Sequence, residues 1–267
     1  DKFLIGFVFR NQLRKSVPNL LEGYSLFKKR NPKANSGLLL HTFFNEGWNI
    51  MKLAAEYGVP HEDIYCTYIC RKGNNYQIDR FTSPERSCSI CNSGEEQTQI
   101  TCNVNDGVSE WQLNDIYNCM DAYCHPFTSG GQEYPIQEAK LAGLVTLVTN
   151  YSCGEEMCER EAESLPLEYS EYREHGTEFI KANTDPRSIA KNLQKVFNMP
   201  KEKRKAKGLK AREWTLKNYS MDSVGKKVEE KIDSFGPVNW DDISLEDEPV
   251  DPFYQIPQIE NDSDWLV

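Results

Sequence analysis

Short apolar runs alternate with segments of helical spacing over most of the chain. The opening run, residues 2–9 (KFLIGFVF), is continuous, as expected for a strand that is buried on both faces of a parallel sheet. Apolar residues then recur at helical spacing between residues 17 and 27, and further continuous runs follow at residues 37–43 and 63–70. This alternation predicts an α/β fold with a doubly wound, Rossmann-like parallel sheet and right-handed crossovers.

A polar segment, residues 71–99, interrupts this alternation, and we interpret it as an insertion that contains cysteines. Strand and helix patterns resume from residue 99 to residue 150 and form the densest βα series in the chain. Farther along, residues 200–219 predict a solvated helix that packs through Leu209, Trp214 and Leu216.

The net charge of −10 is concentrated at one end of the chain. Residues 236–267 hold nine acidic residues and no Lys or Arg, which leaves residues 1–235 with a net charge of about −1. We therefore expect a folded domain over residues 1–235 and an acidic, Pro-rich tail over residues 236–267. Because the body lacks an excess of positive charge, a nucleic-acid partner is disfavoured.

Composition also bears on the compartment. No apolar run approaches the roughly 20 residues that cross a bilayer, and the first residues lack the layout of a secretion signal. Nine cysteines is an odd number, and several fall in or beside predicted regular elements, which favours reduced thiols. The expectation is a cytoplasmic protein without a membrane span.

The turn TSGGQEYPIQEAKLAG, residues 128–143, is the strongest candidate for a ligand site. It follows a predicted strand and leads into a helix, and ligands of open α/β sheets bind at such positions. Gly130 and Gly131 would allow positive φ angles and a close approach of the backbone to phosphate, next to the N–H groups of a helix N-terminus. Glu138 would suit a sugar or ribose hydroxyl pair as an acceptor. Alternatively, the glycines only turn the chain and Glu138 is solvated.

Two cations follow the first predicted strand. Arg10 and Lys15 should lie on the same carboxyl edge of the sheet as the glycine turn, where they could neutralise a diphosphate as it leaves. His125, at the end of another strand, is close to this site in the sequence, but a structural role is equally consistent with its position.

Three segments together resemble the C-terminal, donor-binding domain of retaining GT-B glycosyltransferases (glycosyltransferase family 4, group 1). They are residues 7–24, 113–143 and 144–156, and the resemblance extends over about residues 2–232. It implies a glycosyltransferase that uses a nucleoside-diphosphate sugar, such as a UDP- or GDP-sugar, with retention at the anomeric carbon. The site residues that it implies are Arg10 and Lys15 on the diphosphate, Glu138 on the ribose, and the turn residues Gly130, Gly131, Gln132, Glu133 and Tyr134 on phosphate and sugar.

The chain departs from this family in two respects. The family places a sugar-binding glutamate eight residues before Glu138, where this chain has Gly130. An N-terminal acceptor domain usually precedes the first strand, so the acceptor half is expected from another segment or chain. The alternative to an active transferase is a non-catalytic nucleotide-sugar-binding or assembly module.

Cysteines in and beside the insertion suggest zinc. Cys88 and Cys91 have knuckle spacing, and Cys70 lies upstream at a distance typical of a zinc ribbon. A fourth ligand is needed, and Cys66 or Cys102 could complete the set, although both fall in predicted strands. Free thiols in a surface loop are the alternative interpretation.

Overall fold

The protein is described by a computed structural model that covers residues 2–73, 75–92, 94 and 96–236. Contacts within the chain divide it into residues 1–223, which hold the central sheet, and residues 224–267. The predicted tail, apart from Gly236, lies outside the described residues, so its boundary stays a prediction. No helix in the described segments is long and apolar enough to cross a membrane.

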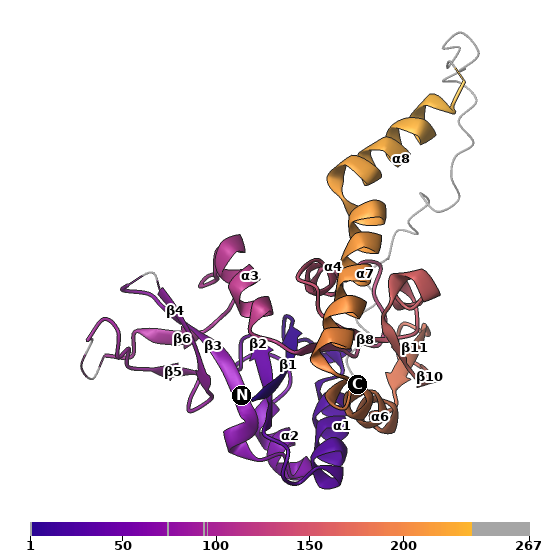
Figure 1. Ribbon diagram of the computed structural model, residues 1–267. Helices are drawn as coiled ribbons and strands as arrows, with labels where there is room; N and C mark the ends of the chain where they lie inside the picture. Colours follow the sequence, from indigo (N-terminus) through magenta and orange to yellow (C-terminus); the bar gives the residue numbers. More distant parts are fainter. Residues whose placement is uncertain (1, 74, 93, 95, 237–267) are drawn as a thin grey trace, which may run out of the picture. The chain divides into compact units, whose positions relative to one another are not determined.

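The elements follow the predicted α/β order (Figure 1). The strands are β1 (Phe3–Val8), β2 (Ser36–His41), β3 (Ile64–Cys70), β4 (Asn75–Arg80), β5 (Glu85–Arg86), β6 (Gln99–Thr101), β7 (Ala122–His125), β8 (Thr146–Thr149), β9 (Leu165–Leu167), β10 (Tyr169–Arg173) and β11 (Ile180–Thr184). The helices are α1 (Val17–Arg30), α2 (Ile50–Tyr57), α3 (Glu110–Asn118), α4 (Tyr134–Leu141), α5 (Cys153–Met157), α6 (Pro186–Phe197), α7 (Lys201–Tyr219) and α8 (Met221–Asp233). The described residues also form the short 3-10 helices η1 (Leu13–Lys15), η2 (His61–Asp63) and η3 (Arg160–Ala162).

The main sheet confirms the doubly wound prediction. Its order is β5-β6-β3-β2-β1-β7-β8-β9, with β4 paired to β3, and all pairs from β3 through β2, β1, β7 and β8 to β9 are parallel. Helices α1, α2 and α6 lie on one face of the sheet and α3, α4 and α7 on the other (Figure 1). The continuous apolar runs form the buried strands, as β1 shows with Ile5 and Phe7 fully buried.

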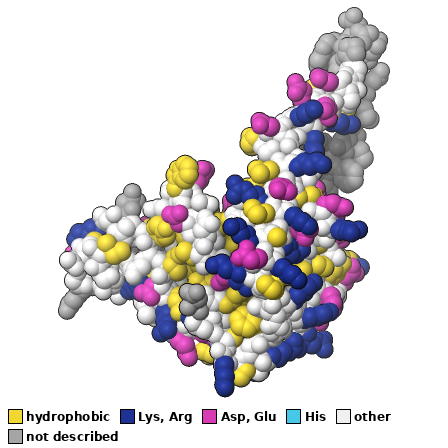
Figure 2. Space-filling model, in the orientation of Figure 1, with side chains coloured by type: hydrophobic (Ala, Val, Ile, Leu, Met, Phe, Trp, Pro, Cys, Tyr) yellow, Lys and Arg dark blue, Asp and Glu magenta, His cyan; other side chains and the backbone are white. Residues whose placement is uncertain are grey.

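Two expectations need correction. The segment 71–99 is not only an inserted loop, because it contains β4 and β5, and the sheet is antiparallel from β3 outward through β6 and β5. In α7, Leu209 and Leu216 are about half exposed, whereas Gly208 and Ala211 are buried. A Cβ at Gly208 would lie 1.8 Å from the carbonyl oxygen of Gly143, so small side chains allow α7 to pack closely. The prediction holds for Trp214, which is partly buried and packs against the core. Its exposed face carries Lys and Arg interspersed with acidic residues (Figure 2).

Candidate functional site

The sheet reverses its direction of winding between β1 and β7. From β1 the chain crosses through α1 to β2 on one side, while from β7 it crosses through α4 to β8 on the other. The loops that leave the carboxyl ends of these two strands therefore diverge, and the space between them is where α/β sheets bind ligands. These loops are residues 9–16 and 126–133, the two segments in which the sequence placed the site.

The loop after β1 is fixed by a buried asparagine. Asn11 is fully buried, and its side-chain amide donates to the carbonyl oxygens of Glu46 and Trp48 while its Oδ1 accepts from the Trp48 backbone N–H at 3.2 Å. The loop then closes through η1 and through Ser16, which has a left-handed φ of 46°. This conformation turns the side chains of Arg14 and Lys15 toward the loop after β7.

Glu133 is the centre of a buried charge cluster. Its Oε1 forms an ion pair with Arg14, and its Oε2 forms an ion pair with Lys15 and accepts a hydrogen bond from His125 Nε2 at 3.1 Å. The Glu133 side chain is 2% exposed and that of Lys15 4% exposed. Arg14 was not selected from the sequence, since only the tight turn of η1 brings it to the same carboxylate as its neighbour.

The proton positions on His125 follow from its partners. Since a carboxylate only accepts hydrogen bonds, Nε2 carries the hydrogen that points to Glu133. In the neutral ring Nδ1 is then an acceptor, and it lies 2.9 Å from the hydroxyl of Tyr123. That hydroxyl also accepts from the backbone N–H of Val8 at 3.4 Å and lies 3.1 Å from the carbonyl oxygen of Val8, which competes with Nδ1 for the one hydroxyl hydrogen. These contacts link β1 to β7.

The pKa values of this cluster shift in a consistent way. Burial lowers the pKa of His125 to about 4, despite its bond to Glu133, so the ring is neutral at neutral pH. Burial alone would raise the pKa of Glu133, but the hydrogen bonds and charges of His125 and Lys15 outweigh it and lower that pKa well below its ordinary value. Burial also lowers the pKa of Lys15, against the opposing effect of Glu133.

Arg10 lies at the other, exposed end of the same loop. Its Nε and one terminal nitrogen contact Oε1 of Glu46 at 2.8 and 2.7 Å, and its side chain is 56% exposed. The pKa of Arg10 is raised by this hydrogen bond and by the charge of Glu46. The structure therefore does not bring the guanidinium of Arg10 and the ammonium of Lys15 onto one common partner.

The two glycines of the turn differ from expectation. Neither Gly130 nor Gly131 adopts a positive φ, so the conformational reason given for them is wrong. A Cβ at Gly130 would lie 2.7 Å from Oε1 of Glu133, whereas one at Gly131 would meet nothing within 4 Å. Gly130 thus leaves room for the carboxylate of Glu133. Its carbonyl oxygen accepts from Ser152 Oγ at 2.8 Å, which fixes the turn to the loop after β8.

Glu138 lies one turn into α4. Its Oε2 accepts a hydrogen bond from the hydroxyl of Tyr117, on α3, at 2.8 Å. The same hydroxyl lies 3.4 Å from the carbonyl oxygen of Pro135. Pro135 and Glu138 share a helix face, since they are three residues apart. Gln132 is exposed on the turn, and Tyr134 is exposed at the first position of α4.

A cavity of about 240 Å³ opens at the carboxyl ends of β1 and β2. Its walls are mostly apolar, and Arg10 and Glu46 lie at its polar part. Thr42 also lines it, and the Oγ1 of Thr42 is buried with no hydrogen-bond partner among the described residues. The wall opposite β1 is formed by residues 102–104 and by Gly107, and Pro135 contributes from the start of α4.

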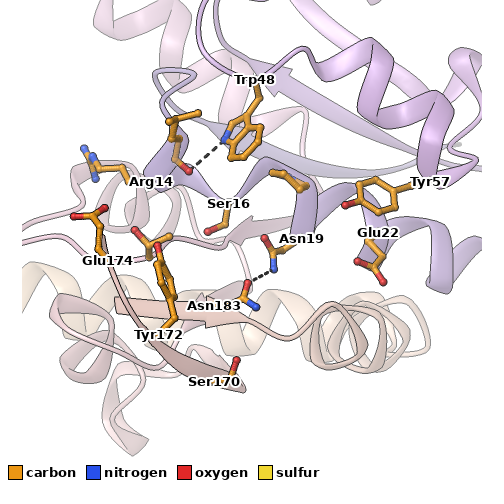
Figure 3. Close-up of a pocket in the computed structure, with 13 residues that line it drawn as sticks. Arg14, Ser16, Asn19, Glu22, Trp48, Tyr57, Ser170, Tyr172, Glu174 and Asn183 are labelled. Carbon is orange, nitrogen blue, oxygen red and sulfur yellow. Dashed lines mark hydrogen bonds between the residues drawn. The ribbon is translucent and has the colours of Figure 1, made fainter. Parts of the chain in front are cut away.

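A larger groove, of about 690 Å³, lies on the other side of the loop after β1 (Figure 3). It separates the segment from η1 to the start of α1, with Arg14, Ser16 and Asn19, from the hairpin β10-β11, with Tyr172. Asn19 Nδ2 donates to Oδ1 of Asn183 at 2.9 Å and so bridges the two walls. The lining of this groove is more polar than that of the cavity at the ends of β1 and β2.

The three predicted zinc ligands come together. The sulfur atoms of Cys70, Cys88 and Cys91 all lie within 4.8 Å of one another. The candidates for a fourth ligand, Cys66 and Cys102, are both buried and do not join this group. Cys66 lies within β3 and Cys102 directly follows β6.

Comparison with known proteins places this geometry in a structural class. No protein-family model matches the sequence, and no curated protein matches it. The fold, however, is that of GT-B glycosyltransferases, whose Rossmann-like domains have the same parallel sheet and flanking helices.

Three solved structures illustrate the similarity. A glycosyltransferase from Rickettsia africae superposes with a TM-score of 0.56 at 13% identity, over 86% of this chain and 47% of the other. The Anabaena protein HepE, in complex with UDP and glucose, has a TM-score of 0.56 at 10% identity, over 88% and 49%. The catalytic domain of a cholesterol-α-glucosyltransferase from Helicobacter pylori has a TM-score of 0.51 at 16% identity, over 82% and 100%. The chain thus spans about half the length of the first two.

Proposed function

We propose that this chain is the donor-binding domain of a glycosyltransferase that uses a nucleoside-diphosphate sugar and retains the configuration of the anomeric carbon. The observation that carries the proposal is the position of three cations on the loop after β1, where the sheet reverses its direction of winding: Arg10 lines the cavity beside Pro135, and Arg14 and Lys15 pair with Glu133 just before α4. The fold similarity adds support, since HepE binds UDP and glucose.

The cations differ in how readily each could leave its carboxylate partner and bind a diphosphate. Arg10 and Glu46 form an exposed pair, and exposed pairs contribute little to stability, so phosphate can replace Glu46 at small cost. Lys15 and Glu133 form a buried pair, which is costly to break. We therefore assign the first phosphate contact to Arg10, and we assign Arg14 and Lys15 to the diphosphate only when Glu133 moves toward the sugar.

The nucleoside fits best in the cavity at the ends of β1 and β2. Apolar walls with a few polar groups are typical of sites for small molecules, and the hydroxyl of Thr42 offers an unused polar atom there. We propose that the base packs against the loop that precedes α3. The backbone N–H of Tyr134 at the start of α4 would face the phosphates, because Pro135 has no N–H and that of Ile136 donates to the carbonyl oxygen of Glu133.

Glu138 is the proposed ribose ligand, although it lines a recess beside Tyr117 and Arg212 and not the cavity assigned to the base. Its carboxylate is half-buried and is oriented by Tyr117, which leaves Oε1 as an acceptor for a hydroxyl group. Gly130 carries no side chain to hold the sugar, so the proposed sugar contacts come from the backbone of Gly130 and Gly131 and from Gln132, Glu133 and Tyr134.

Nucleotide binding tests this proposal. UDP, GDP and ADP would be titrated into the protein by calorimetry, and one of them should bind and raise the melting temperature. Arg10→Ala should weaken that binding at least about tenfold, because a charge-assisted contact to phosphate is lost. Arg30→Ala is the matched control, since Arg30 is an exposed arginine at the far end of α1. Absence of binding by all three nucleotides would contradict the proposal.

The alternative, a nucleotide-sugar-binding or assembly module, makes the same binding prediction and differs in turnover. Sugar release or transfer from a labelled donor separates the two, and it should be measured with any acceptor domain that occurs in the native protein. The acceptor half is proposed to come from another segment or another chain, because catalysis in a cleft closed to water strengthens electrostatic stabilisation.

A further inference from the structure

The cysteine cluster is well suited to zinc, and its geometry arises from the register of three strands. On one side of β6, Gln99 pairs with Cys70, and on the other side it pairs with Arg86. Cys88 lies two residues beyond Arg86, and the turn after it brings Cys91 back to the same place. Sheet pairing therefore places Cys70 beside the start of the loop that carries Cys88 and Cys91.

The distances between the sulfur atoms match those of a tetrahedral site. Two sulfur atoms that are each about 2.3 Å from one tetrahedral zinc ion lie about 3.8 Å apart. The sulfur atoms of Cys70 and Cys91 are 3.6 Å apart, and all three sulfur atoms lie within 4.8 Å. A single ion can thus reach the three ligands with small adjustments of the side chains.

Backbone N–H groups point at two of the sulfur atoms. The N–H of Gly73 donates to Sγ of Cys70 at 3.3 Å. The backbone of Ile90 and Cys91 forms hydrogen bonds to Sγ of Cys88. Such N–H bonds stabilise a thiolate more than a thiol, and the thiolate is the form that binds metal.

We propose that Cys70, Cys88 and Cys91 bind one Zn²⁺ as thiolates, with the release of three thiol protons. Cys70 and Cys88 are buried and Cys91 is half-buried, so the fourth position is directed outward, toward an exchangeable nitrogen or oxygen donor. No fourth cysteine, histidine or carboxylate joins the group among the described residues.

The site also links the cysteine cluster to the cavity assigned to the nucleoside. Strand β6 runs from the cluster directly into residues 102–107, which form one wall of that cavity. Zinc would hold the outer, antiparallel part of the sheet in register and so keep this wall in place. The zinc proposal itself does not depend on the nucleotide proposal, because its tests measure metal.

Metal analysis of the purified full chain provides the test. Elemental analysis should find about one zinc per chain, and X-ray absorption should show three sulfur ligands and one lighter ligand. Cys88→Ser should lower the zinc content at least about fivefold. Cys119→Ser is the matched control, since Cys119 is exposed and lies outside the cluster, and it should retain zinc.

A histidine replacement keeps the test informative if the serine variant fails to fold. Cys91→His offers another zinc ligand and should retain metal in a folded chain, whereas Cys91→Ala should lose it. The proposal would be overturned if neither zinc nor cobalt bound to the reduced, folded wild-type protein. It would also be overturned by a disulfide between Cys70 and Cys91 in protein purified without oxidant, or by a zinc content that is unchanged in Cys88→Ser.

Discussion

The two ends of the loop after β1 carry similar ion pairs in opposite environments. At one end Arg10 meets Glu46 with more than half of the arginine side chain exposed, and at the other Lys15 meets Glu133 with both side chains buried. Solvent screens the first pair and leaves the second at nearly full strength. The first end is therefore available to a ligand, while the second holds the two loops of the site together.

Removal of each carboxylate should give the largest contrast between the two ends. Glu133→Ala leaves Lys15 buried without a counter-charge, and the cost of breaking such a pair is about 3–5 kcal/mol of unfolding free energy. Glu46→Ala removes the partner of an exposed cation and should leave stability within the error of measurement. Urea unfolding of both variants beside the wild type measures the difference.

Two outcomes would break this comparison. Equal stability of Glu133→Ala and Glu46→Ala would mean that water screens both pairs alike. Glu133→Gln distinguishes charge from packing, since it keeps the volume and removes the charge. We expect it to lose most of the stability that Glu133→Ala loses.

A fall in pH should first lower the free energy of unfolding through protonation of His125, which contacts the buried Lys15–Glu133 pair. The pKa of His125 is about 4 in the folded protein against an ordinary value of 6.5, so the unfolded chain binds a proton that the folded chain does not. The stability from this group is complete above pH 6.5 and is lost as the pH falls toward 4, by about 2 kcal/mol between pH 7 and pH 5. Glu133 adds its own loss only at lower pH, because its pKa is lowered from 4.5.

Unfolding at pH 7 and pH 5 checks this effect. His125→Gln cannot titrate but can still donate to Glu133, so its stability should change less between the two pH values than that of the wild type. The pKa of His41 is also lowered to about 4, but His41 is present in both proteins and its contribution cancels. The same pH dependence in both proteins would exclude His125 as the source.

The sequence predicted the parallel half of the sheet because burial on both faces leaves a continuous apolar run. Residues 2–9 and 63–70 coincide with β1 and β3 to within one or two residues. The antiparallel strands β4 and β5 were missed, since partly buried edge strands keep polar residues such as those of residues 75–80. For α7 the prediction was right for Trp214 and wrong for Leu209 and Leu216, because close helix contact selects small residues, which an apolar pattern does not reveal.

The site was predicted in part for a similar reason. Loop positions after buried strands follow from topology, so Arg10, Lys15 and the glycine turn could be placed on one edge of the sheet. Which cation pairs with which carboxylate depends on φ and ψ within the loop, above all at Ser16 with its φ of 46°. For that reason neither the role of Arg14 nor the burial of Glu133 could be derived from the sequence.

The substitution Gly130→Ala should have the smallest effect on stability. It tests how tightly the side chain of Glu133 is packed. In Gly130→Ala the new Cβ would lie 2.7 Å from Oε1 of Glu133. A carboxylate at the end of a free side chain would simply move, but this one is held by Arg14, Lys15 and His125, so the adjustment should cost about 1–2 kcal/mol. Gly131→Ala is the control one residue away, where a Cβ meets nothing within 4 Å. If both alanine variants unfold at the wild-type urea concentration, Glu133 moves freely and the buried end is open to phosphate as well.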